Sequence, residues 1–320
     1  MTCPATQILG ILFTTVLLSA SVQAVERIRI AYPGPAAQFI PLQLTQSKGF
    51  LKDDGLDAEI IRMAGNLPSA ALVNGDIDYS AVVAVRATLL GLPLRVVACY
   101  VPSSPVALIA RPEFKSVREL KGKPIGVQSF GGALNVQINM ILRHFGLDPE
   151  RDVKFLLTGE GASRLAAMKQ GLIAATAGSP PIDYLGMKMG FVVLAKAHEL
   201  FNYPNSGLVT TIKKIKERPN EIKKVIKAGI RANNYIRTNR EGTIQFLMSQ
   251  QKIDREIAAA TYDSVYKAFN EDGSVPEDGL RLIIEEAKKT SNVNRQVSID
   301  EVTDLAILRE AQKELGIKGK

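Results

Sequence analysis

The feature that most constrains the fold is a buried strand pattern that breaks at glycines and continues as a helix pattern. In its clearest copy the apolar run Ile125–Val127 is followed by Gly131 and Gly132, and a helix pattern starts at Asn135. The glycines allow a tight turn and a close approach of the backbone to a ligand. Because a helix start presents free N–H groups and the positive end of the helix dipole, this turn is a predicted binding site for a small anion.

The same unit occurs twice in the chain. When Ala31 is laid on Val127, Gly75 falls on Gly171 and the strand and helix patterns of the two halves coincide. Alternating strand and helix patterns predict the α/β class with mainly parallel sheets. The repeat therefore predicts two α/β lobes of one plan, which face each other with the carboxyl ends of their strands, where open α/β sheets bind ligands.

The order of the patterns predicts how the chain passes between the lobes. The break at Pro102–Pro105 is the expected crossing, because it separates two apolar strand patterns. We predict a first lobe over residues 25–102, a second lobe over 103–208, and a return to the first lobe over 209–320. The hinge is expected at Pro102–Pro105 and at the return strand near 207–211. The last part is predicted to form helices that pack on the first lobe, at 219–239, 242–250, 254–269, 277–290 and 300–315.

Length and composition limit the function classes. A chain of 320 residues with 46% hydrophobic residues can bury two medium cores. Its two cysteines, Cys3 and Cys99, exclude a disulfide scaffold and a cysteine metal cluster. The formal net charge of +8 is concentrated in Lys213–Lys227, where basic and apolar residues alternate at helical spacing, as on a solvated helix face. We expect no nucleic-acid partner, no metal and no cofactor, and a bias toward small anions.

The first 24 residues have the pattern of a secretory signal peptide. They contain no charged side chain, and Ile8–Leu18 is an almost continuous apolar run of the length of a signal-peptide core. Small residues ending in Val22-Gln23-Ala24 form a cleavage site, so cleavage is expected after Ala24 and the mature protein is expected in the periplasm. The alternative is an uncleaved anchor, since no basic side chain precedes the apolar run.

Loops at the carboxyl ends of the predicted strands are the candidate ligand contacts. They are small, polar or rich in glycine, which suits hydrogen bonds from backbone and hydroxyl groups. The principal anion site is expected in the second lobe, with the Ser129 hydroxyl and the amides of Gly131 and Gly132 as donors. The further candidates from these loops are Pro35, Ala36, Gln38, Ser80, Phe130, Ser179 and Pro180.

Several short motifs carry a family resemblance. The chain resembles the periplasmic substrate-binding proteins of the NMT1/THI5-like, nitrate/sulfonate/taurine class, which serve ABC importers, over roughly residues 27–212. One departure is Gly171–Ala175, which has alanine where the common pattern Gly-x-Val-Asp-Ala has aspartate. The motifs are Leu72–Asp78, Gly91–Pro93, Ser116–Lys123, Gly146–Pro149 and Arg164–Gly171 followed by Ala174.

The resemblance implies a type II periplasmic-binding fold in which a ligand is held between two lobes that close on a hinge. It adds Ser103 and Ser104 of the expected crossing to the candidate ligand contacts. It also implies a small-molecule ligand, a sulfonate, nitrate or carboxylate-like anion, and permease subunits in the inner membrane as partners of a monomeric binding protein. Arg86 or Arg164 could reach the anion, although each falls in a helix pattern typical of a solvated face.

Two other function classes remain open at this stage. One is a binding subunit that feeds a signalling receptor, and the other is a pyrimidine-synthesising enzyme of the same broad family, which uses a cysteine-rich motif absent here. An enzyme is not expected, because the two histidines, His144 and His198, have no nucleophile or metal-ligand partner at a suitable spacing.

Overall fold

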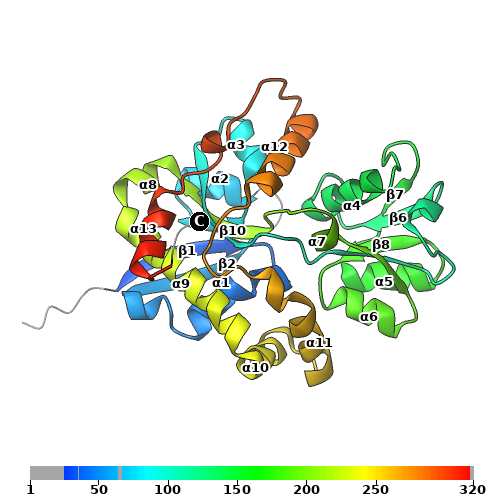
Figure 1. Ribbon diagram of the computed structural model, residues 1–320, viewed down its shortest axis with the longest axis horizontal. Helices are drawn as coiled ribbons and strands as arrows, with labels where there is room; N and C mark the ends of the chain where they lie inside the picture. The colour runs from blue at the N-terminus through cyan, green and yellow to red at the C-terminus, as the bar shows by residue number, and fades with distance from the viewer. Residues whose placement is uncertain (1–24, 35, 64–66, 318–320) are drawn as a thin grey trace, which may run out of the picture.

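The chain forms two α/β lobes in a computed structural model that describes residues 25–34, 36–63 and 67–317 (Figure 1). Each lobe has one five-stranded sheet. The first sheet has the strand order β2-β1-β3-β10-β4, and the second has the order β7-β6-β8-β5-β9. The strands of the first sheet are β1 (Glu26–Tyr32), β2 (Leu56–Arg62), β3 (Tyr79–Val82), β4 (Leu94–Val101) and β10 (Ser206–Thr211); those of the second are β5 (Ala107–Ala110), β6 (Pro124–Val127), β7 (Lys154–Leu157), β8 (Ala175–Gly178) and β9 (Val192–Lys196).

The two sheets confirm the repeat seen in the sequence. β1 is parallel to β2 and β3, and β6 is likewise parallel to β7 and β8. In the fourth place of each sheet lies an antiparallel strand that the chain enters by crossing from the other lobe, β10 in the first sheet and β5 in the second. The predicted α/β class with two lobes is therefore correct, and each lobe completes its sheet with a strand that follows a crossing.

Helices cover both faces of each sheet. In the first lobe, α9 contributes Ile222, Ile226 and Ile230, which are four residues apart and lie on one helix face, to the main core. Ile28 and Ile30 of β1 lie in the same core. The second lobe carries α4 (Ala133–His144), α5 (Gly161–Lys169), α6 (Ile182–Lys188) and α7 (Ala197–Leu200). The first carries α1 (Ile40–Ser47), α2 (Leu67–Asn74), α3 (Val85–Leu89), α8 (Ile212–Glu217), α9 (Pro219–Thr238), α10 (Arg240–Gln251), α11 (Arg255–Val265), α12 (Glu277–Ser291) and α13 (Ala306–Glu314).

The helices expected after residue 212 are present with shifted ends. The segment expected as one helix over 254–269 is α11 followed by the 3-10 turn η4 (Tyr266–Ala268). The segment expected as one helix over 300–315 is the 3-10 turn η5 (Ile299–Glu301) and then α13. Three further 3-10 turns are η1 (Ala37–Phe39), η2 (Lys52–Asp54) and η3 (Val117–Leu120).

Two chain crossings, which lie side by side, join the lobes. The first follows β4 at residues 102–106, and the second precedes β10 at residues 201–205. They are linked by backbone hydrogen bonds from Tyr203 N to Pro102 O at 3.1 Å and from Asn205 N to Val101 O at 2.9 Å. The expected hinge at 207–211 is wrong, because those residues pair with β3 and β4 inside the first sheet. The lobe boundary expected at residue 208 also falls within this strand.

Ser104 lies at the centre of the paired crossings. Its side chain is fully buried, and its hydroxyl is hydrogen-bonded to Gln137 of α4. The same oxygen accepts hydrogen bonds from Val106 N at 3.2 Å and from Asn205 Nδ2 at 3.3 Å. Ser104, expected to contact the ligand, instead ties the two crossings to the second lobe, because no part of its surface is exposed.

A buried polar network holds the opposite end of the first sheet. Tyr79 of β3 donates a hydrogen bond of 2.5 Å to Glu221 of α9. Glu221 is only 5% exposed. Lys214 of α8 lies 2.7 Å from Glu221 and 2.8 Å from Asp78. Burial and the Glu221 carboxylate raise the pKa of Tyr79 well above its usual value. The network thus fixes α8 and α9 to the sheet through one carboxylate.

The predicted signal peptide, residues 1–24, lies outside the described residues. Among the helices that are described, none combines the length and the apolar character that crossing a membrane requires.

Candidate functional site

The predicted anion site lies where β6 ends and α4 begins. Ser129 and Phe130 are exposed in this loop, and Gly131 has a φ of +69°, a left-handed conformation that favours glycine. Gly132 is the N-cap residue of α4, and no side chain caps the helix. The first amides of α4 therefore lack the side-chain acceptor that would normally satisfy one of them. An anion could take that place.

One of the three predicted donors is already used. The amide of Gly131 donates a hydrogen bond of 2.9 Å to Oδ1 of Asn135, one turn into α4. Asn135 is 6% exposed, and its Nδ2 has no hydrogen-bond partner in the described part of the chain. The amide of Gly131 is therefore occupied in this conformation, and the Ser129 hydroxyl and the amide of Gly132 remain as the predicted donors.

Ser129 and Gly132 are in close contact across the loop. A Cβ atom at position 132 would collide with Oγ of Ser129. The backbone of Gly132, with φ of −70° and ψ of 163°, is one that any residue adopts. Glycine at position 132 therefore leaves room for the Ser129 hydroxyl in its present rotamer, and the backbone conformation favours glycine at position 131.

Arg164 supplies a buried positive charge behind the second-lobe loops. The residue is 4% exposed, so the interpretation as a solvated helix face is wrong. Its guanidinium donates from Nη1 to Gly159 O at 2.7 Å and from Nη2 to Ala177 O at 3.3 Å, and Nε has no partner in the described chain. Burial lowers the pKa of Arg164 from its usual value of 12.5, while Glu160, an exposed neighbour in the same loop, acts in the opposite direction. Among the described residues no carboxylate lies within 4 Å of this cation.

The first lobe contributes loops after β1 and β2. Pro35 lies outside the described residues. Ala36 and Gln38 are half-buried, and Oε1 of Gln38 is buried without a hydrogen-bond partner in the described residues. Arg62, the last residue of β2, is exposed and its Nε lies 3.4 Å from Pro33 O. The sequence analysis did not name Arg62 as a candidate, although the apolar pair Ile60-Ile61 directly before it marks the end of a strand pattern.

The remaining candidates differ in position. Ser80 is 1% exposed within β3, and its hydroxyl accepts a hydrogen bond from Val82 N at 3.2 Å, so it does not lie in a facing loop as expected. Ser103 is half-buried in the first crossing. Ser179 and Pro180 directly follow β8, at the carboxyl end of the second sheet, with Ser179 half-buried and Pro180 buried.

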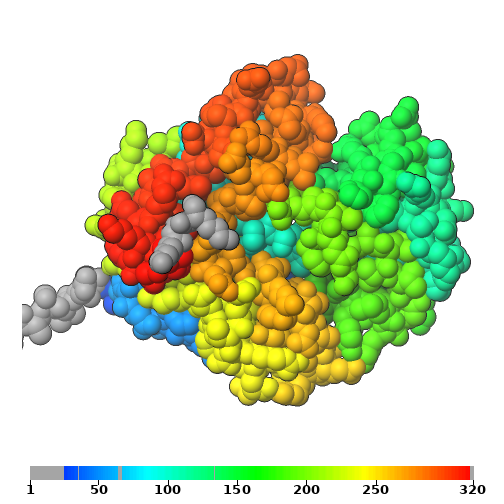
Figure 2. Space-filling view, viewed as in Figure 1, coloured from blue at the N-terminus to red at the C-terminus, as the bar shows by residue number. Residues whose placement is uncertain are grey.

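The lobes meet around these loops. Val83, which follows β3 in the first lobe, packs in the same apolar cluster as Val136 and Met140 of α4 in the second. The carboxyl end of β3 therefore lies near the start of α4. Figure 2 shows an open notch between α12 and the second lobe, and a continuous surface where α11 reaches that lobe.

Ion pairs join the lobes on both sides. Arg143 of α4 lies 2.7 Å from Glu286 of α12, and Lys188 of α6 lies 2.6 Å from Glu256 of α11. Tyr184 of α6 also donates a hydrogen bond of 2.7 Å to Glu256.

In the residues that the structure describes, no group of three or more histidine, cysteine, aspartate or glutamate side chains could hold a metal ion.

The family model described as NMT1/THI5 like matches residues 36–242. The chain belongs to the NMT1/THI5-like family. The matched range begins after β1 and ends in the first turn of α10, so it includes the whole second lobe and all the loops described above except Pro33–Pro35. No curated protein sequence matches this NMT1/THI5-like chain.

Solved structures share the fold over almost the whole chain. The periplasmic aliphatic sulphonate binding protein SsuA from Escherichia coli is 21% identical, with a TM-score of 0.73, and the match covers 87% of this chain and 92% of that one. The periplasmic nitrate-binding protein NrtA from Synechocystis PCC 6803 is 15% identical, with a TM-score of 0.70 and coverage of 91% and 89%. The desulfurization enzyme DSZB is 14% identical, with a TM-score of 0.65 and coverage of 91% and 99%. This NMT1/THI5-like chain therefore has the periplasmic-binding fold, which binding proteins and an enzyme share.

Proposed function

We propose that this protein is the solute-binding component of an ABC importer and that it captures a small anion between its lobes. The observation that carries the proposal is the uncapped start of α4, where the exposed Ser129 hydroxyl and the amide of Gly132 offer donors. The buried guanidinium of Arg164 adds a positive charge to the same lobe. Hydrogen-bond donors and a guanidinium that pairs with no carboxylate favour an anionic ligand over a cationic ligand or a neutral sugar. The sulfonate- and nitrate-binding proteins of the same fold support this class of ligand.

We infer that binding occurs without catalysis. A nucleophile or a general base would be needed near the helix start, and neither histidine offers one. His144 is the last residue of α4, and His198 lies in α7 beside Glu199, at 3.9 Å. The structural similarity to an enzyme is a similarity of fold, and chemistry depends on the side chains placed on it.

The proposed function requires export. We predict that residues 1–24 are removed and that the protein recovered from the periplasm begins at Val25, because a cleavable pattern ends at Ala24. Intact-mass measurement of the periplasmic protein tests this. Recovery of the full-length chain in the membrane fraction would instead indicate an uncleaved anchor.

A thermal-shift screen identifies the ligand. Alkanesulfonates, nitrate, carboxylates and pyrimidines are compared, since a ligand that binds only the folded state raises the melting temperature. An anion that raises the melting temperature supports the proposal, and a pyrimidine as the sole ligand would support the enzyme branch of the family. Genes for a permease and an ATPase beside this gene support import, and a histidine kinase gene alone would indicate sensing.

Ser129→Ala is expected to weaken binding of the anion found in the screen about tenfold. The hydroxyl donates one hydrogen bond to the anion, and such a bond to a charged group contributes about 1.5–3 kcal/mol. In the variant, water replaces part of this interaction because the loop is exposed. Calorimetry measures the change. Ser116→Ala is the matched control, because Ser116 bonds only Glu119 within its own turn. Equal affinities for both variants would place the anion away from the start of α4.

A further inference from the structure

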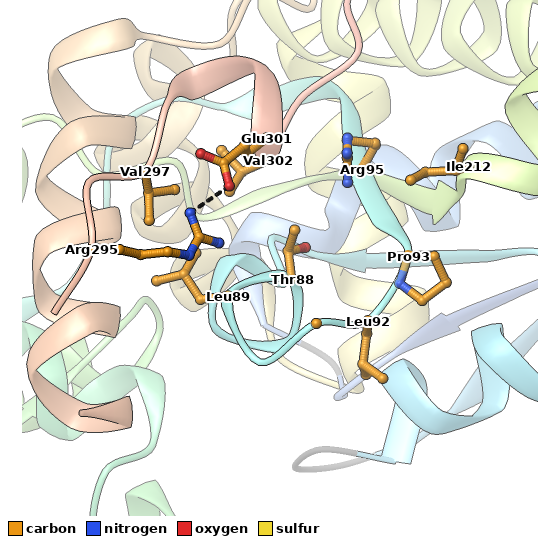
Figure 3. Close-up of a pocket in the computed structure, with 11 residues that line it drawn as sticks. Thr88, Leu89, Leu92, Pro93, Arg95, Ile212, Arg295, Val297, Glu301 and Val302 are labelled. Carbon is orange, nitrogen blue, oxygen red and sulfur yellow. Dashed lines mark hydrogen bonds and ion pairs between the residues drawn. The ribbon is translucent and has the colours of Figure 1, made fainter. Parts of the chain in front are cut away.

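A cavity lies in the first lobe, away from the loops discussed so far. It has a volume of about 260 Å³ and lies where β4 begins and β10 ends. Because β4 is antiparallel to β10 and β10 is antiparallel to β3, this is the end of the sheet opposite to the loop after β3. Its walls come from α3, the start of β4 and the segment around η5 (Figure 3).

Two arginines and one glutamate line this cavity. Arg295 lies 2.6 Å from Oε2 of Glu301, and Oε1 of Glu301 accepts a hydrogen bond of 2.9 Å from Ser298 N. Both oxygens of the carboxylate are therefore occupied. The hydrogen bond from Ser298 and the charges of Arg295 and Arg95 lower the pKa of Glu301 from its usual value of 4.5, so this group remains ionised at neutral pH.

Arg95 is left without an anionic partner. It is half-buried, and its only hydrogen bond among the described residues joins Nη1 to Leu94 O at 2.8 Å. No carboxylate of the described chain lies within 4 Å of its guanidinium. In Figure 3 the nitrogen atoms of Arg95 lie on the side of this residue that faces Glu301. The lining charges, two positive and one negative, leave one positive charge to be balanced.

The rest of the lining is mostly apolar. Leu89, Leu92, Pro93 and Val297 surround the space between the two arginines. The volume is far larger than the roughly 10–15 Å³ that one water needs and lies just below the usual range for small-molecule sites. A ligand that suits this cavity has one oxyanion group for Arg95 and a short apolar chain for the leucines.

We propose that this cavity is a second ligand site, which takes a small organic monoanion with a short alkyl chain. Its oxyanion pairs with Arg95, whose planar fork matches two oxygens of a carboxylate or sulfonate. Its chain packs on Leu89 and Leu92. The site lies at the other end of the first sheet from the proposed interlobe site and does not depend on it, so both can be occupied at once.

Methyl NMR of the mature protein tests the site, with butyrate and butanesulfonate as probes and 1-butanol as the neutral control. Saturable shifts of the Leu89, Leu92 and Val297 methyl groups with at least one of the two anions, and weaker shifts with 1-butanol, support the proposal. Arg95→Met should weaken the binding of that anion at least tenfold, whereas Arg309→Met, which removes an exposed arginine of α13, should leave it unchanged. Ser129→Ala should also leave these shifts unchanged, which separates this site from the interlobe one.

Several outcomes would overturn the proposal. The first is the absence of saturable shifts with either anion up to about 20 mM, a concentration that corresponds to a binding free energy of only about −2.3 kcal/mol. The second is that 1-butanol binds as well as the anions. The third is that Arg95→Met binds the anion as well as the native protein does. Leu92→Trp gives a second variant if Arg95→Met does not fold. It fills the cavity and keeps the charge, so it should abolish the shifts of Leu89 and Val297, and unchanged shifts there would also contradict the site.

Discussion

Gly132→Val is expected to weaken anion binding about 100-fold while the protein stays folded. The new side chain would displace the Ser129 hydroxyl, with which its Cβ collides, and its methyl groups would cover the first amides of α4. Loss of one hydrogen bond to a charged group and of the helix-start interaction together amount to about 2.7 kcal/mol, which is 100-fold in affinity. Calorimetry with the anion found in the screen measures the loss, and the melting temperature without ligand verifies folding.

A smaller substitution tests the cause. Gly132→Ala adds only the Cβ, which fits the backbone conformation at this position but meets Oγ of Ser129. It should weaken binding clearly in the native protein and have little further effect in a Ser129→Ala background, because the colliding atom is then absent. Such coupling is expected between groups in contact. If the two losses simply add, the contact between positions 129 and 132 is not the reason for the glycine.

Much of the fold could be predicted from local patterns. The predicted break at Pro102–Pro105 directly follows β4, and the predicted helix over 219–239 is α9 to within one residue. The pairing of strands that are far apart in the sequence could be predicted less well. The pattern around Gly207 indicates a strand, but nothing local states that this strand lies between β3 and β4, where it pairs on both sides. The expected return crossing therefore lies a few residues after the crossing that the structure shows at 201–205.

The glycine turn at the start of α4 was predicted in position but not in its hydrogen bonds. Glycines after a strand mark the start of α4, because their conformational freedom is a local property. Which amide stays free depends on the rotamer of Asn135, and the sequence contains no signal for it. Ser80 and Ser104 have the small polar character of ligand contacts, yet both are buried. The Ser80 hydroxyl bonds its own strand, and that of Ser104 bonds α4 and the second crossing. The spacing of Arg164 in its helix pattern indicates a polar face, but the carbonyls that bind it come from the loop before α5 and from β8.

Glu221→Ala is expected to destabilise the protein by about 3 kcal/mol. The substitution leaves the hydroxyl of Tyr79 without its acceptor and Lys214 with one carboxylate partner, Asp78, in place of two. Removing one member of a buried ion pair typically costs about 3–5 kcal/mol, and the remaining pair with Asp78 places this case at the lower end. Urea denaturation of the mature protein measures the free energy of unfolding.

Glu310→Ala provides the matched control for this prediction. Glu310 lies on α13 in the same lobe and also pairs with a lysine, Lys223 of α9 at 3.2 Å, but its side chain is 63% exposed. Exposed ion pairs contribute little, because water already solvates both charges and the side chains lose rotational freedom on pairing. The two variants remove the same chemical group from the same lobe and differ in burial. If they shift the urea midpoint equally, the network of Tyr79, Lys214 and Glu221 does not fix α8 and α9 to the sheet, and the burial of this carboxylate has no energetic consequence.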